Sequence, residues 1–322
     1  MSENTVIFQR DYQWMIFTGL MLCFALTTLL IGSFKKKLPR DQGRKFAVEG
    51  ALSEGKARGA GLIFVSVFTV ISAICYVRSL EVALYLVLIM ASMLTGYFDD
   101  AAEKPWGEWK KGILDLVISG GIAATYIVFN GTEVNMALLG FSFEMPIWLY
   151  AILATGLVWM MINVTNCTDG VDGLSSSLVI TVLASFAVMN GIRAYNCPEL
   201  TYMAFYFIAC LLGYLLFNST PSIVLMGDAG SRAMGTLIAV LALLSRDPFM
   251  VLIFALVIIL DGGLGLLKLF LARTIKLKIL KNTRTPLHDH VRKVMGWSNT
   301  QCVFRFVIIQ IVISAAALWF VG

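Results

Sequence analysis

The sequence predicts an all-α integral membrane protein with about ten transmembrane helices, and two observations support that prediction. Of the 322 residues, 58% are hydrophobic and only 14% are charged, whereas soluble proteins carry about 25% charged residues. The apolar residues also fall into blocks of about 20 residues, the length that crosses about 30 Å of hydrocarbon. We therefore expect a single polytopic domain over residues 1–322, with membrane lipid rather than nucleic acid as its surroundings.

The expected helices follow these apolar blocks in chain order. They cover residues 13–33, 60–79, 81–98, 112–129, 146–163, 174–190, 200–217, 234–245, 248–272 and 302–321. The first block is too long for a signal-peptide core and no small-residue cleavage site follows it, so we expect it to stay as a helix. Residues 130–145 contain Gly131, Gly140 and alternating apolar residues, which favours a small external hairpin. The Asp261-Gly262-Gly263 sequence is expected to break the ninth helix, and the neighbouring glycines to leave a groove for a lipid tail.

Lysine and arginine predict the orientation of the chain. The loops 34–59, 99–111, 164–173, 218–233 and 273–301 together hold 19 Lys and Arg residues, whereas the termini and the other loops hold 4. Positive residues stay on the cytoplasmic side of a membrane. Both termini are therefore expected outside, and these five loops are expected to form a cytoplasmic active site.

The first polar motif is the pair Asp99-Asp100, at the expected cytoplasmic end of the third helix. Adjacent carboxylates repel each other, so either one of them has a raised pKa or a cation neutralises both. The alternative is that two acids simply mark a helix end in water. Spacing alone leaves these two readings equally open.

The second motif places Asn163, Asn166, Asp169 and Asp172 within a dozen residues, between two apolar blocks. Charged groups beside membrane spans are costly, and they mark functional sites by default. The alternative is a turn rich in Asn and Asp that satisfies backbone amides. The adjoining spans and the two carboxamides favour function.

The third motif joins Asn218 to the glycine-rich stretch 226–235, which contains Asp228 and Arg232. Glycines let backbone amides approach an anion at the start of a helix. Because Mg²⁺ usually takes one or two carboxylates plus substrate phosphates, Asp228 suits a magnesium ligand, with the amides or Arg232 on phosphate. The alternative is a glycine-rich turn between helices.

The fourth motif, residues 284–293, mixes cations with His288, Asp289 and His290. A basic surface loop near anionic lipid is the simpler interpretation. The paired imidazoles beside Pro286 favour contact with phosphate or pyrophosphate.

The order of these four motifs resembles the polyprenyl-phosphate N-acetylhexosamine-1-phosphate transferase superfamily, from Gly96 to about Phe306. Within it, the late loop is similar to the phospho-N-acetylmuramoyl-pentapeptide transferase family, which usually reads P-I-H-H-H-F-E. Here Asp289 replaces the middle histidine. The family's early G-T-P-T-M-G-G stretch is replaced by residues 55–61, which include Arg58, and Leu225 replaces an aromatic residue.

The resemblance implies transfer of phospho-MurNAc-pentapeptide from UDP-MurNAc-pentapeptide to undecaprenyl phosphate, which yields lipid I and UMP and depends on Mg²⁺. It also implies a homodimer in the bacterial plasma membrane. The catalytic residues implied are Asp99, Asp100, Asp228 and His288, with Asp228 also the metal ligand. The substrate-binding residues implied are Lys111, Asn163, Asn166, Asp169, Asp172, Asn218 and His290.

Two rival functions remain open at this point. A sister enzyme transfers GlcNAc-1-phosphate from UDP-GlcNAc to the same lipid. The altered His288-Asp289-His290 sequence leaves this activity as an alternative. A secondary transporter is a different class, but its site lies near the bilayer midplane on broken helices. Because the polar motifs here are expected at one face, the sequence favours an enzyme over a transporter.

Overall fold

A computed structural model describes residues 3–41, 43, 53–76, 79–102, 104, 106–193, 197–277, 279–280 and 282–321. Its main helices are α1 (Glu3–Phe34), α2 (Gly61–Cys75), α3 (Leu80–Asp100), α4 (Glu108–Asn130), α5 (Ile147–Thr168), α6 (Leu174–Ile192), α7 (Pro198–Asn218), α8 (Gly227–Leu244), α9 (Val251–Phe254), α10 (Leu256–Thr274), α11 (Leu287–Lys293) and α12 (Asn299–Val321). Two short 3-10 helices, η1 (Lys35–Lys37) and η3 (Pro248–Met250), and strands β1 (Ala57–Arg58), β2 (Glu133–Met136), β3 (Phe141–Glu144) and β4 (Val224–Leu225) complete it.

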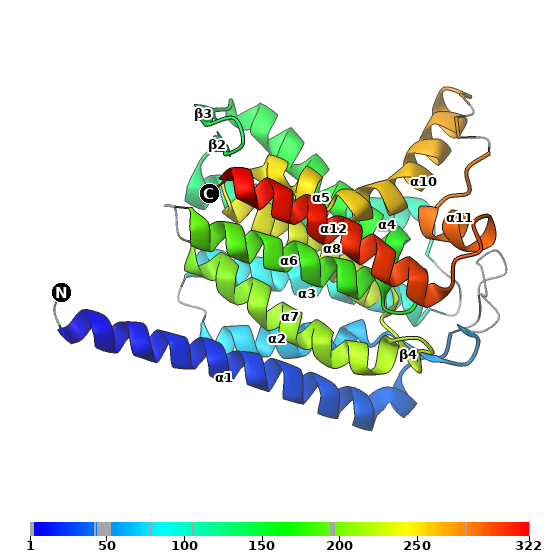
Figure 1. Ribbon diagram of the computed structural model, residues 1–322, viewed down its shortest axis with the longest axis horizontal. Helices are drawn as coiled ribbons and strands as arrows, with labels where there is room; N and C mark the ends of the chain where they lie inside the picture. Colours follow the sequence, from blue (N-terminus) through cyan, green and yellow to red (C-terminus); the bar gives the residue numbers. More distant parts are fainter. Residues whose placement is uncertain are drawn as a thin grey trace.

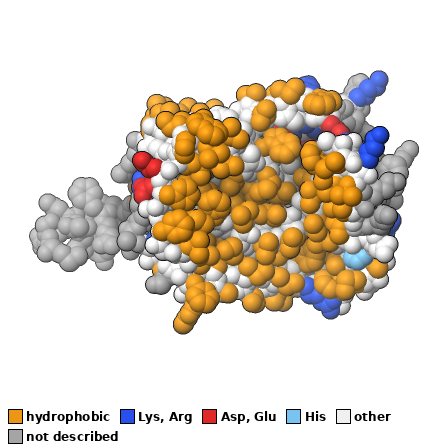
Figure 2. Space-filling view, turned by 90° about the horizontal axis from the view of Figure 1, so that it is seen from above, with side chains coloured by type: hydrophobic (Ala, Val, Ile, Leu, Met, Phe, Trp, Pro, Cys, Tyr) orange, Lys and Arg blue, Asp and Glu red, His pale blue; other side chains and the backbone are white. Residues whose placement is uncertain are grey.

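The predicted all-α membrane class is confirmed. Within the described residues, 8 helices are long and apolar enough to cross a membrane, and one bent pair makes a ninth. The second expected span is shorter than predicted, because α2 has only 15 residues. Both termini lie at one end of the bundle, and β4 and α11 lie at the other (Figure 1). Hydrophobic side chains cover the middle of the face in Figure 2, as expected of a surface in contact with lipid.

Helix α8 is the centre of the bundle and is buried along its entire length, with α3 and α5 packed against it. The sequence predicted a helix over 234–245, but α8 begins at Gly227. The expectation of a glycine-rich loop was wrong, because small residues in membrane bundles let helices approach closely instead of breaking them. Asp228 therefore lies in the first turn of the central helix, where the positive end of the helix dipole favours a carboxylate.

The ninth expected span is bent by 87°, but at Ala255 rather than at the predicted glycines. Gln310 of α12 satisfies the backbone at this bend: its Oε1 accepts from Val257 N at 2.9 Å and its Nε2 donates to Ile253 O at 3.0 Å. A break inside a membrane persists only where other groups satisfy the freed backbone. Gly262 instead packs its backbone directly on the Val164 carbonyl of α5, and α10 continues through the glycines, so the expected break there was wrong. The groove for a lipid tail stays a prediction.

Several helix ends differ from the predicted ones in ways that affect the polar motifs. Helix α5 continues to Thr168, so Asn166 lies on a helix and not on a loop. Helix α4 starts at Glu108, which places Lys111 in its first turn. The late loop contains α11, which carries both histidines. Polar residues at a helix end can stay helical when side chains of other helices form hydrogen bonds with them. A hydropathy profile contains no information about those partners, so it ends the helix too early.

The expected hairpin over 130–145 is confirmed as an antiparallel pair of β2 and β3. The Asp247 carboxylate fastens it to the bundle, since its Oδ2 accepts from Ala137 N at 2.8 Å. Asp247 is only 1% exposed. Burial therefore raises the pKa of this carboxyl above its ordinary value.

Candidate active site

The site forms where the end of α3 meets the start of α8. Gly96 lies directly on the Asp228 backbone, so a side chain at residue 96 would overlap the first turn of α8. Gly227 has a positive φ of 70°, and a side chain there would overlap the Asp100 carboxylate. A positive φ is costly for residues other than glycine. These two glycines therefore bring Asp99 and Asp100 close to Asp228.

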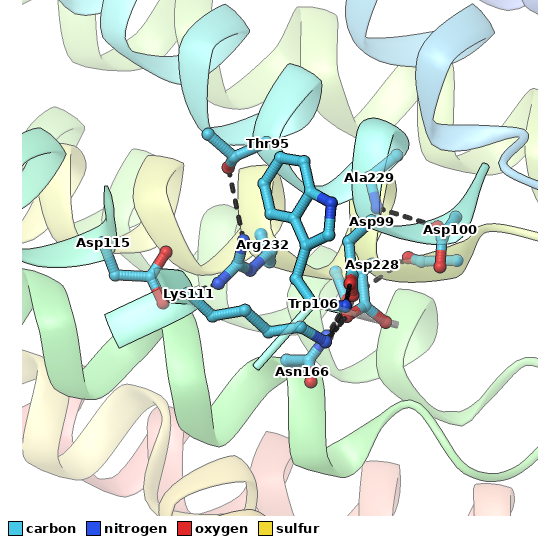
Figure 3. A network of polar contacts seen from close by, with 12 residues as sticks. Thr95, Asp99, Asp100, Trp106, Lys111, Asp115, Asn166, Asp228, Ala229 and Arg232 are labelled. Carbon is cyan, nitrogen blue, oxygen red and sulfur yellow. Dashed lines mark hydrogen bonds and ion pairs between the residues drawn. The ribbon is translucent and has the colours of Figure 1, made fainter. Parts of the chain in front are cut away.

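The two neighbouring carboxylates of α3 are neutralised separately. The Asp99 carboxylate forms an ion pair with Lys111 of α4 through Oδ2, and its Oδ1 accepts from Trp106 N at 2.7 Å (Figure 3). The Asp100 carboxylate pairs with a different cation, Arg58, whose Nη2 lies 2.9 Å from Oδ1. Each of these adjacent acids therefore has a cation of its own.

Asp228 lies between the same two cations. Its Oδ1 is 3.2 Å from Arg58 Nη2 and its Oδ2 is 3.6 Å from Lys111 Nζ. Ala229 N donates to Asp100 Oδ2 at 3.4 Å, which ties the start of α8 to the end of α3. Three carboxylates and two cations therefore form one network, which we call the carboxylate cluster: Asp99, Asp100, Asp228, Arg58 and Lys111.

Arg58 is a cluster member that sequence reasoning missed as a site residue. It lies on β1, which pairs in parallel with β4 immediately before α8, and its backbone N donates to Pro39 O at 2.8 Å. Burial acts to lower the pKa of Arg58, but the charges of Asp100 and Asp228 and the hydrogen bond to Asp41 outweigh it, so the pKa lies above its ordinary value. The signal in the sequence was the departure of residues 55–61 from the family pattern, which places an arginine in this loop.

Arg232 does not lie with the cluster, contrary to expectation. It is one helical turn deeper on α8, where its Nη2 donates to Asp115 Oδ2 at 2.7 Å and its Nη1 donates to Thr95 Oγ1 at 3.3 Å (Figure 3). The side chains of Arg232 and Asp115 are 4% and 1% exposed. A charge this deeply buried needs a partner. Arg232 is therefore the buried ionic partner of Asp115, one turn away from the carboxylate cluster.

The second motif begins on α5, beside the cluster, and its two asparagines face different groups. Asn166 Nδ2 donates to Ser231 Oγ of α8 at 2.8 Å, whereas Asn163 Nδ2 donates back to Trp159 O of its own helix at 2.9 Å. Asn166 thus joins α5 to the central helix near Asp228 (Figure 3), while this bond of Asn163 stays within α5.

The two aspartates of this motif shape the turn between α5 and α6. Asp169 Oδ1 accepts from Ser175 Oγ at 2.7 Å. Asp172 Oδ2 accepts from Ser222 N at 3.0 Å and lies 3.8 Å from Lys56 Nζ. Asp172 therefore meets the loop that also carries Arg58.

Asn218 uses its carboxamide to join two turns. Its Oδ1 accepts from Gly173 N at 2.9 Å, and its Nδ2 donates to Val224 O at 2.9 Å. Asn218 is 4% exposed. It fixes the turn after Asp172 against the strand that leads into α8.

The histidines of α11 point to different surroundings. His288 is buried, with Nδ1 2.8 Å from Asp261 Oδ2 and its backbone N donating to Asp261 Oδ1 at 2.7 Å. Its Nε2 lies against Gly170, where any side chain would overlap the ring. His290 is half-buried and accepts from Arg284 N at 3.3 Å. The structure thus joins His288, but not His290, to the second motif.

The oxygen-rich cluster suits a hard cation better than a zinc-type site. In the described part of the chain, no three His, Cys, Asp or Glu side chains are grouped to enclose a metal ion. Magnesium does not need such an enclosure, because it usually takes one or two carboxylates together with substrate phosphates and waters. Asp228, at a helix start and beside Asp100, provides that kind of donor set.

Comparisons with known proteins identify the family of this chain. Residues 82–246 match the family described as Glycosyl transferase family 4. The chain is 39% identical over 319 residues to a phospho-N-acetylmuramoyl-pentapeptide-transferase of Treponema pallidum (strain Nichols), covering 94% of this chain and 88% of the relative. It is 26% identical to the protein of that name from Thermotoga neapolitana, and the match covers 94% of this chain and 98% of that relative. The chain therefore belongs to the phospho-N-acetylmuramoyl-pentapeptide-transferase family of membrane transferases.

Proposed function

We propose that the chain transfers phospho-MurNAc-pentapeptide from UDP-MurNAc-pentapeptide to undecaprenyl phosphate, giving lipid I and UMP. The observation that carries this proposal is the carboxylate cluster at one end of an apolar helical bundle. The acceptor has a hydrocarbon tail that must remain in the membrane while its phosphate reaches water. A polar site at the end of the bundle accommodates both parts of such a substrate.

The reaction joins two anions, so charge neutralisation is the main requirement for catalysis. An oxygen of the lipid phosphate attacks the phosphorus attached to the sugar, and the bond from that phosphorus to UMP breaks. The protein stabilises such a phosphoryl transfer mostly by position and electrostatics. Lys111 is placed to meet the lipid phosphate, and Asp99, which is paired with Lys111, is placed to orient that phosphate or accept its proton.

Asp228, with Asp100 beside it, is the proposed holder of Mg²⁺. The ion, when bound, supplies positive charge to the diphosphate of the donor. The first turn of α8 holds the Asp228 carboxylate in place, and the contact between Gly227 and Asp100 keeps the second carboxylate near it. The protein thereby fixes the two carboxylates before any substrate arrives.

The nucleotide side of the site is proposed to lie along the second motif. Its residues are Asn163, Asn166, Asp169 and Asp172, with Asp172 nearest the uracil. Asn218 acts through the turn that it holds after Asp172. His288, oriented by Asp261, contacts the pyrophosphate. His290, on the same helix but with other neighbours, is proposed to bind the substrate from α11.

We place this site on the cytoplasmic face of the bacterial plasma membrane, with both termini outside and with a homodimer as the assembly. The proposal on orientation rests on the asymmetry of Lys and Arg between the two sets of loops.

The decisive experiment compares donors with the full chain in detergent or lipid. Radiolabelled UDP-MurNAc-pentapeptide and UDP-GlcNAc are each supplied with undecaprenyl phosphate and Mg²⁺. We expect labelled lipid and UMP from the MurNAc-pentapeptide donor alone, and neither from the Asp228→Asn variant. Turnover of UDP-GlcNAc instead would assign the sister reaction, and no UMP release from either donor would refute a transferase.

A further inference from the structure

Both oxygens of the Asp228 carboxylate already face a protein cation. Lys111 lies 3.6 Å from Oδ2 and also contacts Asp99. Arg58 places one nitrogen, Nη2, 3.2 Å from Asp228 Oδ1 and 2.9 Å from Asp100 Oδ1. A single nitrogen of Arg58 therefore bridges the two carboxylates that are best placed to hold a divalent cation.

A metal ion and this guanidinium cannot occupy the same position. Magnesium binds carboxylate oxygens at about 2.1 Å, closer than any hydrogen bond, and it repels a neighbouring positive charge. Lys111 can release Asp228 and keep its contact with Asp99, which is the closer of its two partners. Arg58 Nη2 lies between Asp100 and Asp228, so it has to move when an ion binds there.

Arg58 also has an anchor that survives such a movement. Its Nη1 lies 2.9 Å from Asp41 Oδ1. Asp41 Oδ2 in turn accepts from Ser53 Oγ at 2.6 Å and from Gly43 N at 3.3 Å. Arg58 Nε is buried and has no hydrogen-bond partner among the described residues. The guanidinium can thus leave the two carboxylates while Asp41 keeps it at the edge of the cluster.

We propose that Arg58 and the divalent cation exchange at Asp228. In the ion-free protein Arg58 neutralises Asp100 and Asp228, and on metal binding it releases them and stays on Asp41. There its free N–H groups face the phosphates that accompany the ion, and a guanidinium matches phosphate oxygens well. This inference rests on the proposed function, because it takes Asp228 as the metal ligand.

The test measures metal binding directly, without substrates or turnover. Mn²⁺ is titrated into the full chain, and free Mn²⁺ is followed by its electron paramagnetic resonance signal. Because a charge-assisted hydrogen bond is worth about 1.5–3 kcal/mol, we expect Arg58→Met to bind Mn²⁺ at least about tenfold more tightly than the wild type. Arg40→Met is the matched control, since Arg40 is a cation of the same loop that donates to Gly55 O at 3.2 Å and touches no carboxylate in the described residues.

Each outcome separates the exchange from the metal site itself. If Arg58→Met binds Mn²⁺ no more tightly than Arg40→Met while Asp228→Asn loses binding, the exchange is wrong and the metal site stands. If Asp228→Asn binds Mn²⁺ as the wild type does, both proposals are wrong. Should Arg58→Met fail to fold, Arg58→Gln removes the same charge but can still bond to Asp41, and the same tenfold gain is expected of it.

Discussion

Two ion-pair regions lie one helical turn apart on α8, and they differ in access to water. In the carboxylate cluster, the side chains of Asp228, Arg58 and Lys111 are 12%, 19% and 27% exposed, while those of Asp99 and Asp100 are 5% and 1% exposed. In the deeper pair, Arg232 and Asp115 are 4% and 1% exposed. Asp228 and the two cations of the cluster have access to water, whereas the inner charges pair with each other away from water. Asp228 and Arg232 thus lie one turn apart on the same helix, and we propose that only Asp228 takes part in the chemistry.

The largest effect is expected from breaking the inner pair. Removing one member leaves the other charge buried without its ionic partner, which costs about 3–5 kcal/mol of stability. Arg232→Met should therefore lower the melting temperature of the purified protein sharply. The double variant Asp115→Leu, Arg232→Met removes both charges and should recover most of that loss. If the double variant is as unstable as the single one, the two side chains stabilise the protein through contacts other than their mutual ion pair.

The outer cluster should respond in the opposite way. Asp228→Asn keeps the volume of the side chain but removes the charge, so we expect transfer to fall roughly a hundredfold or more. The melting temperature should change little, because Asp228 has access to water and its two cations keep Asp99, Asp100 and Asp41 as partners. Steady-state UMP release and a thermal melt on the same sample test both parts. If Asp228→Asn lowers the melting temperature as much as Arg232→Met does, the two regions do not differ in their contribution to stability.

Gln310 is a buried, uncharged hydrogen-bond partner, and its replacement tests whether loss of such a partner destabilises the protein as loss of a charge from the inner pair does. Gln310→Leu leaves Val257 N and Ile253 O at the bend without their partner, at about 1–3 kcal/mol for each group left unsatisfied. We expect a lower melting temperature. Ile309→Leu is a suitable control on the same helix, because Ile309 is exposed and its side chain cannot form a hydrogen bond.

Asp172 separates the nucleotide side from the metal side of the outer region. Asp172→Asn should weaken binding of the UDP-sugar by about tenfold, as expected for loss of one charged hydrogen bond. Its Mn²⁺ affinity should stay near that of the wild type. Calorimetric titration with the donor and the Mn²⁺ titration give the two values. Normal donor binding with lost metal binding would return Asp172 to the metal site.

The smallest effect is expected at the surface. Arg273 and Glu108 form an ion pair of 2.9 Å between side chains that are 65% and 81% exposed. Such pairs contribute about 0–1 kcal/mol. Arg273→Met should therefore leave the melting temperature almost unchanged, and a clear drop would show a role beyond this contact.

The sequence predicted most of the helices because apolar length and charge asymmetry are properties of the chain itself. It misplaced the start of α8 because glycine is read as a loop former, while Gly96 and Gly227 serve close contact between α3 and α8. It misplaced the bend for the same reason: Gly262 packs on α5, and Gln310, far along the chain, satisfies the bend at Ala255. The start of α8 and the position of the bend both depend on contacts between residues that are distant in the sequence.

The order of the acidic and histidine motifs, and with it the family, was determined by the sequence alone, because carboxylates and imidazoles beside membrane spans are rarely placed without a purpose. The pairing of those residues was decided only by the tertiary structure. Arg232, expected at the phosphate, lies with Asp115, and Arg58, not expected in the site, lies between Asp100 and Asp228. The physical reason is that a cation's partner depends on distance and on access to water, and folding sets both.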